Sequence, residues 1–205
     1  LKAGILTSLA AGVTMLPGIV EGPRMTAGMN ALLTAAGGTA GRLIPDSGTA
    51  AYAHVMGGRD EMVRVTRQQI KHGADWVKIH VTGSLPNRAG ELTAWSLDEL
   101  RAVTDTAHAL DTPTLAHCRN AESTRLAAEA GVDLIDISAG RFESYEWVIQ
   151  PQTTPEGALA PFSEAVKRVA RVPVGLAGRL KSPEYVEALL AAGKADLINI
   201  GRQLI

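Results

Sequence analysis

Two glycine–arginine pairs near the C-terminal end of the chain have the residue types and spacing of an anion site. The pairs are Gly178-Arg179 and Gly201-Arg202, and each follows a short apolar run. Glycine lets the backbone approach an anion closely. After the last two strands of a (β/α) barrel, backbone N–H groups and a helix N-terminus bind phosphate. The pattern predicts a small phosphate-bearing ligand; the alternative is tight turns with solvated arginines.

A second group of polar side chains lies in the middle of the chain. Lys78 and His80 alternate with apolar residues, so both side chains lie on the same face of an expected strand. His117 closes the next expected strand. Two interpretations stay open: metal ligands, or a lysine and histidines inside a barrel without metal.

Short apolar runs alternate with amphipathic stretches along the chain, which is typical of βαβ units and a parallel sheet. The expected strands are residues 13–16, 42–44, 76–81, 114–117, 134–138, 172–177 and 197–200. The expected helices are residues 1–11, 26–35, 59–72, 96–110, 121–130, 161–170 and 183–192. Ser182-Pro183-Glu184 has the pattern of an N-cap followed by proline at the first helical position.

One turn recurs four times, where a helix ends at glycine and a strand follows: at Gly12, Gly73, Gly131 and Gly193. These turns favour an α/β protein of the TIM type, a (β/α)8 barrel or a near-complete one, over a mixed α+β fold. The length of 205 residues is near the lower limit for such a barrel, roughly 200 residues. We expect a single domain, 1–205, built from an N-terminal segment (residues 1–135) and a C-terminal segment (residues 136–205).

Composition excludes several classes of partner. The formal net charge is −1, so nothing attracts the chain to nucleic acid or to an anionic membrane. No stretch approaches the roughly 20 apolar residues of a membrane span. The single cysteine, Cys118, suggests a reducing compartment. We expect a cytoplasmic protein, with unpaired strand edges that could favour a homo-oligomer.

Residues 1–135 resemble the imidazolonepropionase and prolidase-like branch of the amidohydrolase superfamily. The resemblance rests on Ala11-Gly12-Val13-Thr14, Val77-Lys78-Ile79, Thr82-Gly83-Ser84 and Ala116-His117. It implies that Lys78, carbamylated, bridges metal ions and that His117 is a ligand. Zn²⁺ or another divalent metal would suit these donors and would lower the pKa of a bound water. The paired histidines of the family's first strand are absent.

Residues 132–205 resemble FMN-dependent oxidoreductases of the old yellow enzyme type, particularly the 2,4-dienoyl-CoA reductase branch. The matching phrases are Asp136-Ile137-Ser138-Ala139-Gly140, Glu146-Trp147-Val148-Ile149-Gln150-Pro151, Ala177-Gly178-Arg179 and Gly193-Lys194-Ala195-Asp196-Leu197, which leads to Gly201-Arg202. The resemblance implies that Gly178, Arg179, Gly201 and Arg202 hold the FMN phosphate, with contacts from Ala177 and Ile200. The cluster cysteines of the dienoyl reductases are absent.

Three functions follow from these patterns. The favoured one is a hybrid barrel, a chimera of natural or engineered origin, with a residual phosphate or FMN site at the ends of its last two strands. The second is an FMN-dependent NAD(P)H oxidoreductase. The third is a metal-dependent amidohydrolase that uses Lys78 and His117. Whether the chain is an enzyme stays open, and catalytic residues are not assigned.

Overall fold

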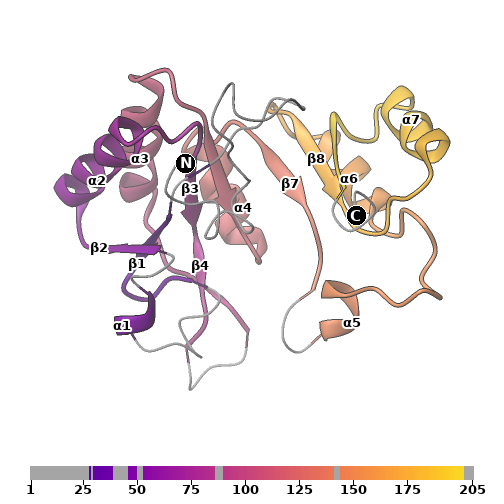
Figure 1. Ribbon diagram of the computed structural model, residues 1–205, viewed down its shortest axis with the longest axis horizontal. Coiled ribbons are helices and arrows are strands. Elements are labelled where there is room, and N and C mark those ends of the chain that lie inside the picture. The colour runs from indigo at the N-terminus through magenta and orange to yellow at the C-terminus, as the bar shows by residue number, and fades with distance from the viewer. Residues whose placement is uncertain are drawn as a thin grey trace, which may run out of the picture. The chain divides into compact units, whose positions relative to one another are not determined.

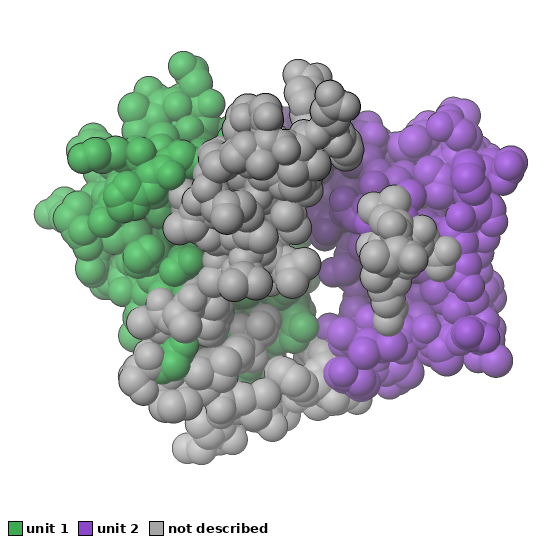
Figure 2. All heavy atoms as spheres, in the orientation of Figure 1, with its two compact units in different colours: residues 1–132 green, residues 133–205 purple. Residues whose placement is uncertain are grey.

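A computed structural model describes residues 28, 30–38, 46–49, 53–85, 90–140 and 144–200. The chain is an α/β protein in which parallel strands alternate with helices. It divides into two compact units, residues 1–132 and residues 133–205, which Figure 2 shows in green and purple. No helix among the described residues is long and apolar enough to span a bilayer.

The first unit is built on a four-stranded parallel sheet in the order β2-β1-β3-β6. Its strands are β1 (Ala31–Thr34), β2 (Ala53–Met56), β3 (Val77–His80) and β6 (Thr114–His117). β3 and β6 pair in register, so that Lys78 lies opposite Leu115 and His80 lies opposite His117. This pairing places the ends of both strands at the same edge of the sheet.

Helices follow the strands of the first unit. They are α1 (Asp46–Thr49), α2 (Arg59–Lys71), α3 (Leu97–His108) and α4 (Ala121–Glu129). Helices α2 and α3 lie side by side in Figure 1. Each buries an apolar stripe, which in α3 includes Leu100 and Val103, against Val77 and Ile79 of β3 in one hydrophobic core. Along β3 the buried residues Val77 and Ile79 alternate with Lys78 and His80, whose side chains lie on the opposite face.

A short antiparallel pair lies beyond β3, between β4 (Thr82–Gly83) and β5 (Leu92–Thr93). Gly83 is required there because a Cβ at this position would overlap the backbone of Ala36. Thr34 Oγ1 donates a hydrogen bond to the carbonyl of Ala94, at 2.8 Å. The segment after β3 is therefore folded against the end of β1.

The second unit contains a three-stranded parallel sheet in the order β7-β8-β9. Its strands are β7 (Ile135–Ile137), β8 (Val174–Ala177) and β9 (Leu197–Asn199), and its helices are α5 (Tyr145–Val148), α6 (Ala160–Lys167) and α7 (Pro183–Ala191). Leu176 on β8 is fully buried among Leu159, Leu180 and Leu189. This core fixes the turn after β8, where the first glycine–arginine pair lies.

Most expected elements are present within one to three residues of their predicted bounds. Gly73, Gly131 and Gly193 have the positive φ angles, 90°, 89° and 66°, of left-handed helix caps. The helix expected at 26–35 is wrong at its C-terminal end, because β1 occupies Ala31–Thr34. The sequence also missed β2 and the β4–β5 pair. The elements expected at 1–11, 13–16 and 42–44 lie outside the described residues.

Candidate functional site

The imidazoles of His80 and His117 stack on one another at the ends of β3 and β6. Their ring centroids are 4.7 Å apart and the planes are inclined by 13°. Parallel pairing in register brings the two side chains to the same face of the sheet. The carbonyl of His80 accepts a hydrogen bond from Trp95 Nε1, at 2.6 Å. The backbone of His80 is therefore held by a buried tryptophan.

Both imidazoles are neutral at physiological pH. Burial lowers the pKa of His80 to about 4, with smaller contributions from the charges of Lys78 and Arg119. Burial likewise lowers the pKa of His117 to about 2, and His80, Lys78 and Arg119 lower it further. Neutral imidazoles are the form that binds metals.

Two nitrogens of this pair lack hydrogen-bond partners among the described residues. They are Nδ1 of His80 and Nε2 of His117, and both are buried. Structural zinc sites use four ligands and catalytic sites use three protein ligands. No group of three or more His, Cys, Asp or Glu side chains within the described ranges could hold a metal ion. The pair therefore does not fit a catalytic metal by itself.

A buried ion pair lies near the histidines. Arg119 Nη1 contacts Glu91 Oε1 at 2.6 Å, and the Glu91 side chain is only 5% exposed. Glu91 Oε2 is buried and has no hydrogen-bond partner within the described residues. The carbonyl of Glu91 accepts from Asn120 Nδ2, at 3.1 Å. The loop before β5 is thus attached to the segment that follows His117.

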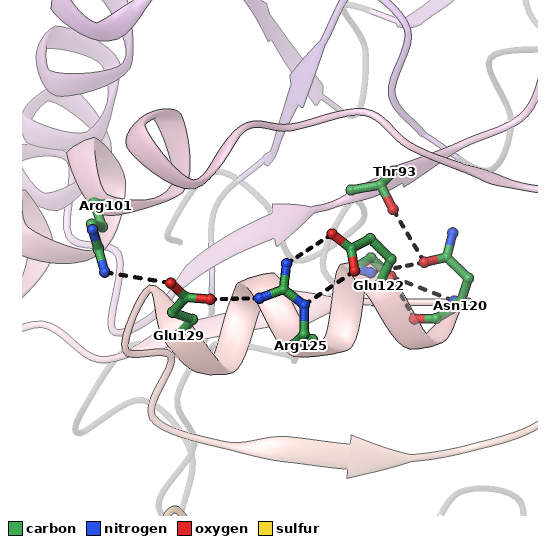
Figure 3. A network of polar contacts seen from close by, with 7 residues as sticks. Thr93, Arg101, Asn120, Glu122, Arg125 and Glu129 are labelled. Carbon is green, nitrogen blue, oxygen red and sulfur yellow. Dashed lines mark hydrogen bonds and ion pairs between the residues drawn. The ribbon is translucent and has the colours of Figure 1, made fainter.

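Asn120 connects β5 to helix α4, as Figure 3 shows. Its Oδ1 accepts from the N–H of Ser123, at 2.8 Å, and from Thr93 Oγ1, at 3.1 Å. The first of these bonds caps the N-terminus of α4 as part of a capping box. One side chain therefore fixes both the start of α4 and the position of β5.

Cys118 follows the histidine on β6 and is partly buried. Burial raises the pKa of its thiol to about 11, although hydrogen bonds with Ser123 and Thr124 act in the opposite direction. The thiolate is the reactive form of cysteine. Burial therefore disfavours the thiolate form of Cys118.

The second unit contains a cavity of about 660 Å³ at the carboxyl ends of its strands. Its lining includes residues from β8 and the turn after it, and residues from the segment 147–152. Ligands of open α/β sheets bind at the carboxyl ends of the strands. Of the residues predicted for the phosphate site, Ala177, Gly178, Arg179 and Ile200 line this cavity. Gly201 and Arg202 lie outside the described residues.

Gly178 has a backbone conformation that favours glycine, with φ at 108°. A Cβ at Gly178 would lie 3.0 Å from Leu159 Cδ1 and 3.5 Å from Gln150 Oε1. Because Gly178 has no side chain, it lines the cavity with its backbone. The glycine is therefore required both by the turn and by its neighbours.

Arg179 continues this turn in the left-handed region, with φ at 49°. Its Nη2 donates to the carbonyl of Gln152, at 2.7 Å. Its Nε is buried and has no hydrogen-bond partner within the described residues. A guanidinium has five N–H donors in a fixed geometry that matches phosphate. Arg179 therefore keeps donor capacity on a wall of the cavity.

Gln150 lies beside Gly178 and lines the same cavity. Both Oε1 and Nε2 of its side chain are buried and lack hydrogen-bond partners within the described residues. The sequence placed Gln150 inside a matching phrase but gave it no role. Nothing in the local pattern distinguishes it, because its position depends on the fold of 149–159 around β8.

Glu156 holds the turn between β8 and α7. Its carboxylate accepts from the N–H groups of Lys181 and Ser182, each at 2.6 Å, and from Ser182 Oγ, at 2.7 Å. The bond from the Ser182 N–H is the main cause that lowers the pKa of Glu156. Ser182 is the N-cap residue of α7, as predicted, but its hydroxyl bonds to Glu156 and not to the helix.

No protein-family model matches the chain. Comparison with curated proteins relates a segment of the chain to oxidoreductases. It is 35% identical over 81 residues to a NADH oxidase of Thermoanaerobacter brockii, which is 40% of this chain and 12% of that protein. It is 32% identical over 84 residues to a cinnamate reductase of Clostridium sporogenes (41% and 13%). It is 36% identical over 77 residues to a NADPH dehydrogenase of Geobacillus thermodenitrificans (38% and 21%). The chain thus spans a small fraction of these relatives.

Three solved structures with a similar fold are a prolidase, an amidohydrolase and an ochratoxinase. A prolidase in complex with N-methylphosphonate-L-proline has a TM-score of 0.53 at 22% identity, over 90% of this chain and 49% of that one. An amidohydrolase has a TM-score of 0.55 at 23% identity, over 85% and 54%. Ochratoxinase from A. niger has a TM-score of 0.52 at 18% identity, over 83% and 38%. These likenesses concern the fold.

Both resemblances inferred from the sequence are therefore present. Curated relatives of the old yellow enzyme type match about two fifths of the chain, and the structural neighbours are amidohydrolases and prolidases. The sequence matches cover 77 to 84 residues in these three relatives, about the length of the segment 132–205. The chain combines similarity in sequence to NAD(P)H oxidoreductases with similarity in fold to amidohydrolases.

Proposed function

We propose that residues 133–205 bind a phosphate-bearing ligand, with FMN as the first candidate, at the carboxyl ends of β8 and β9. One observation carries the proposal: Ala177, Gly178 and Arg179, predicted for the phosphate site, line one cavity. Names of the matching relatives support it, since NADH oxidase and NADPH dehydrogenase are redox enzymes. The proposal also includes Gly201 and Arg202, which follow β9.

The described residues fit a flavin phosphate in three respects. Gly178 lines the cavity with a backbone that carries no side chain, Arg179 has a buried Nε without a hydrogen-bond partner among the described residues, and the cavity has a volume usual for ligand sites, roughly 300–1,000 Å³. Arg179 would hold the phosphate, with the Gly178 backbone beside it. Bound FMN would supply redox chemistry at its ring.

The two units are, in this proposal, segments of one TIM-type barrel, one amidohydrolase-like and the other oxidoreductase-like. Each unit contains parallel strands followed by helices, and βα units of different barrels pack on their neighbours in similar ways. Amidohydrolase-like structures match 85–90% of the chain, which supports a common architecture. A hybrid of this kind retains a phosphate site without a complete set of catalytic groups.

Flavin absorbance tests the phosphate site. The purified chain is mixed with FMN, excess flavin is removed, and the visible spectrum is recorded before and after. We expect a retained flavin band, and an affinity at least tenfold lower in the Arg179→Ala/Arg202→Ala variant, because a hydrogen bond to a charged group contributes about 1.5–3 kcal/mol. The control is Arg168→Ala/Arg171→Ala, which removes the same charge from exposed positions. Equal affinity of both variants would exclude the assignment.

An FMN-dependent NAD(P)H oxidoreductase is the enzymatic form of this proposal. Its support is the redox activity that the names of the relatives state. The measurement is oxidation of NADH or NADPH by the FMN-loaded chain with an activated alkene as acceptor. Retained FMN without turnover would leave a binding protein, which is the function we favour.

A divalent metal site at Lys78 and His117, with His80 beside them, is the second candidate and corresponds to the metal-dependent hydrolase. The described residues supply too few ligands for a catalytic metal, so the test concerns metal binding alone. Its supporting observation is the two buried imidazole nitrogens that lack partners among the described residues. Thermal unfolding with and without Zn²⁺ tests it, in the wild-type chain and in His117→Phe. A Zn²⁺-dependent rise in Tm that His117→Phe abolishes would support the site, and an unchanged wild-type Tm would exclude it.

A further inference from the structure

The amide of Gln150 is a polar group of the second unit's cavity that the phosphate site does not use. Its Oε1 and Nε2 are both buried without hydrogen-bond partners among the described residues. They lie 3.5 and 3.6 Å from the position that a Cβ of Gly178 would occupy. An unused donor and an unused acceptor therefore lie next to the backbone proposed to approach the phosphate.

Two other side chains of the cavity, Asn199 and Arg179, form hydrogen bonds. Asn199 Nδ2 donates to Asp136 Oδ1, at 2.5 Å, and Arg179 Nη2 donates to the carbonyl of Gln152. Arg179 Nε and Gln150 Oε1 are a donor and an acceptor in the same cavity, yet neither has a partner among the described residues. The two side chains are therefore not satisfied by each other, and each has capacity for a ligand.

The chemistry of an amide defines the missing partner. A phosphate oxygen accepts hydrogen bonds, so a fully ionised phosphate can satisfy Nε2 but not Oε1. A hydroxyl group both donates and accepts, and can satisfy either atom or both through two neighbouring hydroxyls. A buried polar atom left without a partner loses its hydration without compensation, so the amide favours a ligand that supplies both functions.

We propose that Gln150 is a specificity-determining residue that recognises hydroxyl groups adjacent to the phosphate of the ligand. The ligand class is thereby narrowed to phosphorylated polyols, among which is the phosphorylated side chain of FMN. The proposal rests on the phosphate site described above. Within that site Arg179 binds the anion, whereas Gln150 discriminates a hydroxylated chain from an aliphatic one.

Calorimetric titration of the full chain with three probes tests this role. The probes are inorganic phosphate, ribitol 5-phosphate and pentyl phosphate, which share the anion and differ in the chain. We expect the wild-type chain to bind ribitol 5-phosphate about tenfold more tightly than pentyl phosphate, a ratio equivalent to about 1.4 kcal/mol and within the range for one satisfied buried amide. Equal affinities for these two esters would overturn the role of Gln150.

Two variants test whether Gln150 causes the preference for ribitol 5-phosphate over pentyl phosphate. Gln150→Met has a similar volume and no hydrogen-bonding amide, and we expect it to lose the preference for ribitol 5-phosphate while its affinity for inorganic phosphate changes less than about twofold. The control is Gln68→Met, which makes the same replacement at an exposed position of helix α2 that does not line the cavity. A preference that Gln150→Met keeps to the same extent as Gln68→Met would overturn the assignment.

The two proposals can fail separately. If the wild-type chain binds neither inorganic phosphate nor either ester, the phosphate site itself is wrong and the role of Gln150 falls with it. If all three probes bind and the two esters bind equally, the phosphate site stands and only the role of Gln150 is wrong. The comparison of esters uses the wild-type chain, so it holds even if Gln150→Met does not fold.

Discussion

The in-register pairing of β3 and β6 brings His80 and His117, which are far apart in the sequence, next to each other. The alternation of β3 puts His80 on the face of Lys78, and in-register pairing with β6 adds His117. The two rings stack on each other, and one buried nitrogen of each ring has no hydrogen-bond partner among the described residues. Burial and nearby positive charges both oppose protonation, so the neutral pair is maintained only while the fold is intact.

Acid is expected to destabilise the chain through this pair. The folded-state pKa values, about 4 and about 2, lie below the ordinary histidine value of 6.5. Between pH 6.5 and 4 the unfolded chain therefore binds more protons, and the free energy of unfolding falls as pH falls. We expect a loss of about 2 kcal/mol per histidine at pH 5, measured by urea unfolding at pH 7 and pH 5.

The His117→Phe variant separates this effect from general acid sensitivity. Phenylalanine retains an aromatic ring for the stack but does not titrate. We expect the drop in unfolding free energy between pH 7 and pH 5 to be about half that of the wild-type chain. An unchanged drop would show that the histidine pair does not cause it.

Gly178→Ala is expected to destabilise the turn after β8. The φ of 108° disfavours any side chain, and the new Cβ would lie 3.0 Å from Leu159 Cδ1. We expect a loss of about 2 kcal/mol in the free energy of unfolding, together with weaker FMN binding. Gly193→Ala is the control: its φ is also positive, at 66°, but no atom lies within 4 Å of the added Cβ. A loss of about 1 kcal/mol is expected there.

Helix α4 illustrates how one element positions several others. Asn120 caps the helix and bonds to Thr93 and Glu91. Arg125 forms ion pairs with Glu122 and Glu129, and Glu129 also pairs with Arg101 (Figure 3). The Arg125 pairs are exposed, and exposed ion pairs contribute little. The cap is therefore the main polar contribution to the start of α4.

Asn120→Ala should lower the free energy of unfolding by about 1 kcal/mol, the usual effect of a lost N-cap. Asn120→Asp retains an oxygen that can accept from the Ser123 N–H, and we expect it to keep most of the stability. Urea unfolding at pH 7 measures both variants. Equal losses in the two would indicate that the bond from Nδ2 to the Glu91 carbonyl, and not the cap, stabilises this region.

Prediction of the elements succeeded where the pattern is local. Amphipathic periodicity and glycine caps predicted α2, α3, α4 and α7 closely, since both depend on neighbouring residues. The expected helix at 26–35 failed because Ala31–Thr34, an apolar run, pairs with β2 and β3 in the centre of a sheet. Short apolar runs fit a helix or a buried strand equally well, and only pairing decides between them.

At the scale of the whole chain, the proposed barrel makes the two units interdependent. Leu100 in the core of the first unit and Leu176 in that of the second are fully buried, and replacement of either by alanine should cost about 3 kcal/mol. If one barrel forms, calorimetry should show a single transition, and each variant should lower its Tm. Two transitions, each shifted by only one variant, would contradict a single barrel.

The sequence by itself determined the α/β class, most strands and helices, and the two resemblances, because these depend on local periodicity and on contiguous motifs. It also placed Lys78 and His80 on one face, since strand geometry requires it. Only the tertiary structure decided that His80 stacks on His117, that Glu156 holds the turn before α7, and that Gln150 lies against Gly178. These contacts join residues 26 to 37 positions apart, and strand register and core packing bring them together, which no local pattern specifies.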